Sequence, residues 1–221
     1  TSSVSANPSA GFSIASFTTL AGTVGTVGHG LASAPELLIL KTRSSGAAWN
    51  VWHTDILATQ RLRLDGTDAV ATSDVFGNTS PTSTVFTQEI SSTVQTAIAY
   101  AFHSVEGYSK VGSYTGNGST DGTFVHCGFR PAYVMVKQSS SAGNSWMIYD
   151  TERSTFNVIE NTLRANTSEA EDTSTGSGGY GVDIVSNGFK VRTTWDGVNT
   201  SGSTYIFLAF AESPFKNTNA R

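Results

Sequence analysis

The stretch Tyr108–Lys137, YSKVGSYTGNGSTDGTFVHCGFRPAYVMVK, repeats a pattern already present at Phe12–Lys41, FSIASFTTLAGTVGTVGHGLASAPELLILK. Each stretch runs from an aromatic residue and Ser through a Gly/Thr-rich passage to Gly, Pro, an apolar run and Lys. The matched positions are Phe12 with Tyr108, Phe17 with Tyr114, Gly30 with Gly128, Pro35 with Pro131, and Lys41 with Lys137. The chain is therefore an internal duplication of about a hundred residues per copy.

The same register continues beyond these two stretches. WNVW at Trp49–Trp52 corresponds to WMIY at Trp146–Tyr149, and TAIAYAF at Thr96–Phe102 corresponds to TYIFLAF at Thr204–Phe210. Short apolar or alternating runs, separated by turn residues such as Gly, Asn and Pro, are typical of β-strands. We therefore expect an all-β, internally duplicated antiparallel β-sandwich of jelly-roll type with almost no helix. Residues 155–164 are the one segment where a helical turn is expected.

The duplication sets the expected domain organisation. Residues 1–10, TSSVSANPSA, are small and polar with one Pro, so they are interpreted as a linker. Repeat 1 is expected at residues 11–107 and repeat 2 at residues 108–216, with residues 217–221 as a tail. No linker-like composition separates the repeats, so we expect repeat 2 to pack closely on repeat 1.

Composition excludes several classes of function. Of the 221 residues, 38% are hydrophobic and only 14% are charged, and the net charge is −4. Nucleic-acid binding would require clustered Lys and Arg, which the sequence lacks, so no nucleic-acid partner is expected. No apolar run approaches the roughly 20 residues of a membrane span, so no membrane insertion is expected. The single cysteine, Cys127, rules out an internal disulfide framework.

No catalytic motif stands out. The four histidines have none of the spacings of a zinc site, and a Gly-x-Ser-x-Gly nucleophile motif is absent. Asp150 corresponds to His53 in the other copy, so the duplication supplies no matched pair of carboxylates. We predict that the protein is not an enzyme and has no cofactor and no metal site. A calcium site at Asp65–Asp68 stays an alternative, although Asp-Gly is a common hairpin turn.

Aromatic residues provide the best indication of a binding site. Trp and Tyr offer broad apolar planes with a polar edge, which suits stacking on sugar rings. We predict ligand-binding residues at Trp52, Tyr149, Trp195, Asp196 and Asn50. Trp49 and Trp146 share a strand face with Val51 and Ile148, so they are expected in the core. For Trp52 and Tyr149, on the opposite face, a core position remains the alternative.

Several strings of the sequence resemble one family. They are GFSIASF (11–17), VGHGLASAPELLILK (27–41), NTSPTSTVF (78–86), EGYSK and the rest of 106–137, WMIYDTER (146–153), SNGFKVR (186–192) and SGSTYIFLAFAESPFK (201–216). The family is an uncharacterised two-repeat domain at the C-terminal end of virion and tail-fibre proteins of bacteriophages, many of them marine. The resemblance covers nearly all of residues 11–216 and implies no catalytic residues.

This resemblance implies a component of the virion surface, outside the cell, such as the head of a tail fibre or appendage. Its expected partners are a host cell-surface glycan or other receptor, and other virion proteins on its N-terminal side. A homotrimer is expected, because several weak sites on one stalk gain avidity. Two functions remain open: host attachment by glycan binding, or a structural subunit that decorates a capsid or builds an appendage by self-association.

Overall fold

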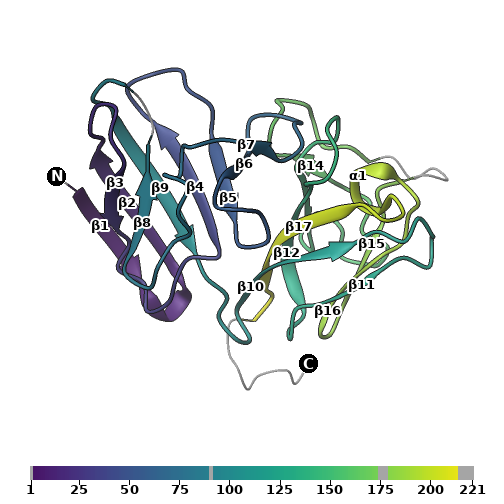
Figure 1. Cartoon of the computed structure of the whole chain (residues 1–221). Helices are drawn as coiled ribbons and strands as arrows, with labels where there is room; N and C mark the ends of the chain where they lie inside the picture. The colour runs from purple at the N-terminus through teal and green to yellow at the C-terminus, as the bar shows by residue number, and fades with distance from the viewer. Residues whose placement is uncertain (1, 90–91, 174–178, 214–221) are drawn as a thin grey trace. The chain divides into compact units, whose positions relative to one another are not determined.

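A computed structural model describes residues 2–89, 92–173 and 179–213 of the chain (Figure 1). The chain divides into two compact units. Unit 1 comprises Thr1–Asp65 and Val70–Val105, and unit 2 comprises Gly66–Ala69 and Glu106–Arg221. Because each unit has its own sheets and its own core, the two are described separately.

Unit 1 is built from two antiparallel sheets. The larger has the strand order β1-β2-β9-β4-β5-β6-β7 and the smaller pairs β3 with β8. Their bounds are β1 Ser2–Asn7, β2 Phe12–Thr18, β3 Gly25–Gly28, β4 Leu37–Thr42, β5 Asn50–His53, β6 Gln60–Arg63, β7 Ala71–Thr72, β8 Val85–Gln88 and β9 Thr96–Phe102.

Unit 2 repeats this plan. Its larger sheet has the order β10-β17-β12-β13-β14 and its smaller one the order β11-β16-β15. The bounds are β10 Ser109–Thr115, β11 Phe124–His126, β12 Pro131–Gln138, β13 Met147–Asp150, β14 Leu163–Arg164, β15 Val182–Val185, β16 Gly188–Val191 and β17 Thr204–Ala211. The order β2-β9-β4-β5-β6 in unit 1 is therefore matched strand for strand in unit 2. The prediction of an all-β, internally duplicated β-sandwich is confirmed.

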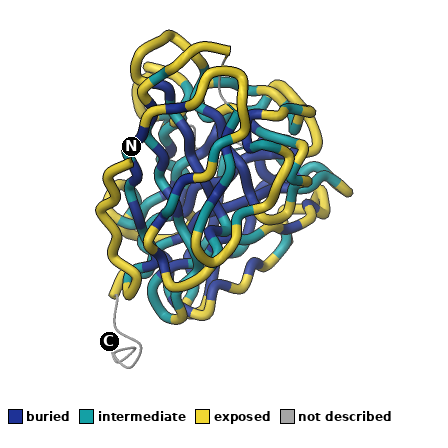
Figure 2. Tube along the Cα trace, turned by 60° about the vertical axis from the view of Figure 1, so that its left-hand side comes forward, coloured by how far each residue is buried: buried dark blue, intermediate teal, exposed yellow. Residues whose placement is uncertain are grey.

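The alternation of buried and exposed side chains along the strands explains why each unit stacks a small sheet on a large one. Strand β9 buries Ala97, Ala99 and Ala101, while the residues between them are half-exposed. Its counterpart β17 turns larger side chains inward, Tyr205 and Phe207, together with Ala209. In Figure 2 the buried stretches gather in the interior of the trace and the exposed ones lie at its outside. Each sandwich therefore closes over one apolar face of its large sheet.

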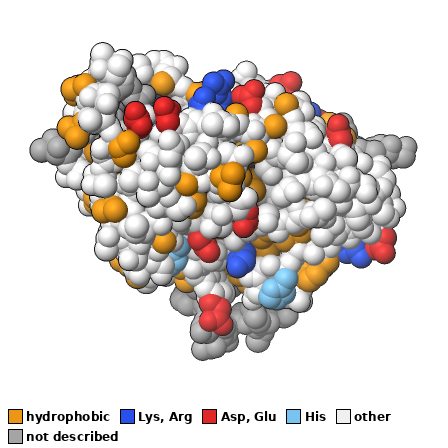
Figure 3. Space-filling model, viewed as in Figure 1, with side chains coloured by type: hydrophobic (Ala, Val, Ile, Leu, Met, Phe, Trp, Pro, Cys, Tyr) orange, Lys and Arg blue, Asp and Glu red, His pale blue; other side chains and the backbone are white. Residues whose placement is uncertain are grey.

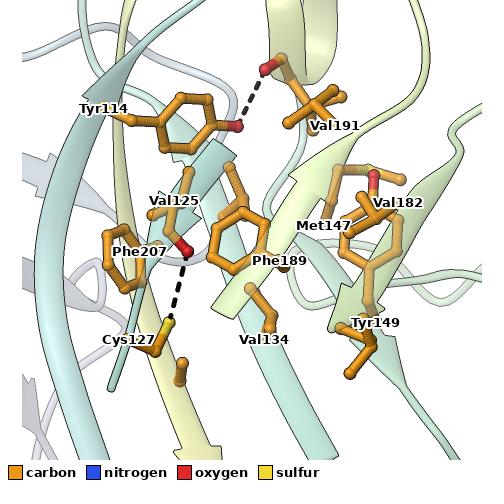
Figure 4. Close-up of a cluster of buried hydrophobic side chains, with 14 of the residues drawn as sticks. Tyr114, Val125, Cys127, Val134, Met147, Tyr149, Val182, Phe189, Val191 and Phe207 are labelled. Atoms are coloured by element: carbon orange, nitrogen blue, oxygen red, sulfur yellow. Dashed lines mark hydrogen bonds between the residues drawn. The ribbon is translucent and has the colours of Figure 1, made fainter. Parts of the chain in front are cut away.

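An equivalent aromatic contact joins the two sheets in each unit. In unit 1 the ring of Phe17 on β2 meets Phe86 on β8 edge-on, with centroids 5.9 Å apart. In unit 2 Tyr114 on β10 meets Phe189 on β16 at 6.0 Å in the same T-shaped manner. Phe86 and Phe189 also occupy equivalent places in the ladders, because each lies opposite a buried Val on the neighbouring strand. Figure 4 shows Phe189 at the centre of the unit 2 core.

The repeated lysines also have matching structural roles. Lys41 donates to the Ala47 carbonyl in the loop after its strand, and Lys137 donates to the Gln138 carbonyl at 2.7 Å. Lys137 is fully buried, and this burial lowers its pKa to about 8. Each ammonium therefore satisfies backbone carbonyls where a large-sheet strand ends.

Two expectations about local structure are wrong. Ser2–Asn7, expected to be a linker, forms the edge strand β1, and Pro8–Ala10 forms a short 3-10 turn, η1. The reason is pairing with β2, which orders a segment whose own composition gives no strand signal. Residues 155–164 form no helix: Ile159 makes an isolated bridge to Val182, and Leu163–Arg164 is β14. The expected tail at residues 217–221 lies outside the described residues.

We predict that the two equivalent phenylalanines are equally important. Phe86→Ala and Phe189→Ala each remove a fully buried ring and leave a cavity between sheets, so each should lower the free energy of unfolding by about 3–5 kcal/mol. Urea unfolding followed by tryptophan fluorescence measures this change.

Phe156, which is 85% exposed, supplies the matched control. Phe156→Ala should change the free energy of unfolding by less than about 0.5 kcal/mol. A similar loss in all three variants would show that the intersheet contact is not what stabilises the units.

Candidate ligand-binding site

Three of the five predicted site residues lie inside the sandwiches. Trp52 belongs to the core of unit 1 and is 4% exposed. Tyr149 is fully buried in the core of unit 2 (Figure 4). Its hydroxyl donates to the Tyr180 carbonyl at 2.8 Å. Asn50 is buried, and its side chain bonds to the Ala48 carbonyl and to Arg61. These three side chains cannot contact a ligand in solution.

The expectation that both Trp49 and Trp146 lie in the core is only half confirmed. Trp146 is buried as expected, but Trp49 is half-buried and stacks on Tyr100 with centroids 6.4 Å apart. The neighbouring strand explains this ambiguity, because Leu37–Leu40 are buried on both faces. Because both faces of β4 are covered, the alternation of side chains along β5 could not indicate which face of β5 turns toward the small sheet.

Trp195 and Asp196 are the two predicted residues that reach the surface. Trp195 is half-buried and caps the start of α1, which spans Asp196–Asn199. Its ring folds back over Gly197, where an added Cβ would come within 1.9 Å of the ring. Only glycine at that position therefore allows this orientation of the indole. Asp196, next in the sequence, is exposed.

Trp195 forms a cluster with three residues that the sequence did not indicate, Tyr180, Arg164 and Asp172. The ring of Tyr180 meets the indole edge-on at 4.4 Å. The Arg164 guanidinium lies 6.0 Å from the centroid of the Tyr180 ring and forms ion pairs with Glu169 and with Asp172, the latter at 3.3 Å. Partial burial, aided by the Asp172 carboxylate, raises the pKa of Tyr180, so its phenol stays protonated. We call Trp195, Tyr180, Arg164 and Asp172 the indole–guanidinium cluster.

Two tyrosines of the large sheet fix the helix that carries Trp195. Tyr114 and Tyr205 lie opposite each other on β10 and β17, and their rings stack at 5.0 Å. The Tyr114 hydroxyl donates to the Val198 carbonyl at 2.8 Å, and the Tyr205 hydroxyl donates to the Asp196 carbonyl at 2.6 Å. Burial raises the pKa of both phenols, which keeps them as donors. The equivalent pair in unit 1 is Phe17 with Ala97, which has no hydroxyl to offer.

Asn199 holds the loops around α1 together. Its fully buried amide nitrogen lies within hydrogen-bond distance of the Asn117 Oδ1, the Ser119 carbonyl and the Thr193 carbonyl, at 2.7–3.1 Å. Its Oδ1 accepts from the Asn117 backbone N–H at 3.0 Å. One side chain therefore connects α1 to the loop between β10 and β11 and to the segment after β16. The position of Trp195 is set before any ligand arrives.

The remaining features to consider are metal-ligating clusters, membrane-spanning helices and surface charge. Within residues 2–89, 92–173 and 179–213, no three His, Cys, Asp or Glu side chains gather closely enough to hold a metal ion. No helix in that part of the chain is long and apolar enough to cross a membrane. On the face shown in Figure 3, charged side chains are scattered over a surface made mostly of backbone and uncharged side chains. The indole–guanidinium cluster offers surfaces for stacking and groups for hydrogen bonding.

The comparisons with known proteins identify the family. Residues 1–214 match the family described as "Domain of unknown function (DUF7483)", so the chain belongs to this family. No curated protein and no solved structure matches the chain.

The buried His29 predicts a pH dependence of stability. Its Nδ1 accepts from the Leu31 N–H and its Nε2 lies 3.1 Å from the Thr82 carbonyl, so the neutral ring is the form that fits. Burial lowers the pKa of His29 below 6.5. Below that pH the unfolded chain binds a proton that the folded chain does not, so the free energy of unfolding should fall as the pH falls from 6.5.

His29→Asn keeps an acceptor near the Nδ1 position and removes the titration. Urea unfolding at several pH values between about 5 and about 7.5 should give a shallower slope for this variant than for the wild type. Equal slopes would contradict the assignment of the neutral form to His29.

Asn199→Asp tests whether one amide organises the loops around Trp195. The substitution keeps the shape but replaces donors with acceptors that face three oxygens, so we expect a loss of about 2–4 kcal/mol in stability. Hydrogen exchange should accelerate in residues 116–123. Asn187→Asp, at an exposed position of the same unit, is the control and should leave both measurements unchanged. Slow exchange in the Asn199→Asp loop would rule out this role.

Proposed function

We propose that this member of the DUF7483 family is a non-catalytic host-attachment module on the surface of a bacteriophage virion, and that the indole–guanidinium cluster of unit 2 binds a cell-surface glycan. The virion setting rests on the resemblance of its sequence strings to two-repeat domains of phage virion and tail-fibre proteins. The binding role rests on one observation: a half-buried indole is held in place by a buried hydrogen-bond network beside exposed carboxylates.

The chemistry of the cluster suits a sugar. An indole face packs against the C–H face of a pyranose ring, and the ring is rigid enough to lose little entropy on binding. Arg164, Asp172 and Asp196 supply donors and acceptors that match neighbouring hydroxyl groups. The Arg164 charge is balanced by Glu169 and Asp172. We therefore propose a neutral glycan rather than a strongly anionic one.

A fixed scaffold increases affinity by reducing the entropy lost on binding. Tyr114, Tyr205 and Asn199 hold α1 through contacts with backbone groups, so Trp195 is ordered without a ligand. A single small site of this kind binds weakly. We propose that a homotrimer multiplies the affinity through simultaneous contacts with the cell surface.

The experiment is a glycan array probed with the full chain, followed by calorimetric titration of the glycans retained. Trp195→Ala should weaken binding about tenfold or more, since loss of one stacking surface corresponds to about 1.4 kcal/mol. Asp196→Asn, at an exposed position that leaves the backbone bond of α1 intact, should weaken binding by a smaller factor.

Trp49→Ala is the matched control. Trp49 is also half-buried and packs on another aromatic ring, but it belongs to unit 1, whereas the indole–guanidinium cluster belongs to unit 2. Its replacement should leave glycan binding unchanged. Retention of no glycan by the wild type, or equal losses in Trp49→Ala and Trp195→Ala, would overturn the proposal.

A further inference from the structure

Strand β1 leaves one side of the unit 1 sheet open. In the part of the chain that the structure describes, β1 pairs with β2 alone, and all six of its residues are exposed. The backbone groups of an antiparallel strand point alternately to its two sides. Every second residue of β1 therefore presents an N–H and a C=O away from the sheet, in position to pair with another strand.

This edge has none of the usual protection. Edge strands are commonly shielded by charged side chains, proline or a bulge. Ser2–Asn7 reads SSVSAN, without a charge or a proline, and its pairing with β2 continues without a bulge from Ser2 to Asn7. The edge strand β10 of unit 2 differs, because it carries Lys110. Lys110 thus supplies a charge on the edge strand β10, whereas β1 carries none.

Packing against the core does not account for β1. Val4, its largest apolar residue, is 40% exposed. Val4 and Ala6 approach the backbone at Gly30 on one face, and the rest of the strand consists of small polar residues. The order of β1 therefore depends on main-chain pairing with β2. Five of its six side chains are Ser, Ala or Asn, so the strand carries little side-chain bulk beside its open edge.

We propose that β1 pairs with β1 of a second copy of this chain, so that two unit 1 sheets become one continuous antiparallel sheet. A second copy fits because the strand is uncharged, and self-pairing sets no like charges opposite each other although the whole chain carries −4. A twofold axis through an antiparallel ladder places a residue opposite its own copy. Either Val4 meets Val4 or Ser5 meets Ser5, and both are small.

The small number of hydrogen bonds and the small buried area indicate a weak contact between the two β1 strands. In either register five residues of each strand pair over about 17 Å, and each hydrogen bond contributes roughly 0.5–1.5 kcal/mol net. The buried area falls below the roughly 800 Å² per partner of a standard interface. The pair therefore forms mainly at high concentration or where copies are held close together. This inference does not depend on the glycan proposal.

Sedimentation velocity of the full chain over a wide concentration range tests the pairing. The wild type should show a concentration-dependent dimer. The variant Ser3→Lys/Ser5→Lys places two lysines on the outward face of β1. In either register a lysine of one copy lies opposite a lysine of the other copy. The dissociation constant of the dimer should therefore rise about tenfold. The corresponding glutamate pair, Ser3→Glu/Ser5→Glu, should weaken the dimer similarly. A mixture of the two variants should restore it.

Ser45→Lys/Ala47→Lys is the control, because it adds the same charge to an exposed loop of the same unit. It should dimerise like the wild type. A wild type without any concentration-dependent association step, or one whose association steps are all unchanged by the lysine pair, overturns the proposal. Glycan binding per chain should be unchanged in the variant Ser3→Lys/Ser5→Lys. A failure of the β1 pairing can therefore be distinguished from a failure of the glycan-binding proposal.

Discussion

The edge-on contact between an aromatic ring of the large sheet and a phenylalanine of the small sheet is the interaction that the fold depends on. Phe17 meets Phe86 in unit 1, and Tyr114 meets Phe189 in unit 2, at nearly the same separation. Aromatic side chains bury about 150–250 Å² each, and the T-shaped geometry adds a directional attraction. Each sandwich can therefore close with a small sheet of only two or three strands.

Two tyrosine hydroxyl groups next to this contact distinguish unit 2 from unit 1. Tyr114 stands where unit 1 has Phe17, and Tyr205 stands where unit 1 has Ala97. The two phenols hold α1, which lies in residues 192–203 between β16 and β17. The equivalent connection of unit 1, residues 89–95, is shorter. The duplicated strands thus supply the same framework twice, while polar substitutions in its core allow one copy to order a longer loop.

The sequence predicted the framework well because duplication and alternation are properties of strands. Repeated positions such as Pro35 and Pro131 fixed the register, and the strand orders of the two units agree. The site was predicted less well. Trp52 and Tyr149 are chemically suited to ligands and equally suited to a core, and only the placement of the small sheet decides between these roles. Tyr180 and Arg164 could not be linked to Trp195, because residues distant along the chain meet only through the fold.

The scarcity of charge affects how such a surface can recognise a partner. With 14% charged residues, the chain has few groups whose attraction salt would screen. The proposed stacking of a glycan on Trp195 and the proposed backbone pairing at β1 are both short-range contacts that depend little on ionic strength, since neither requires net charge. Both contacts are also weak when single, and both gain strength when copies are held together. A low-charge surface of this kind is therefore suited to repeated display, where many small uncharged contacts replace a few strong ionic ones.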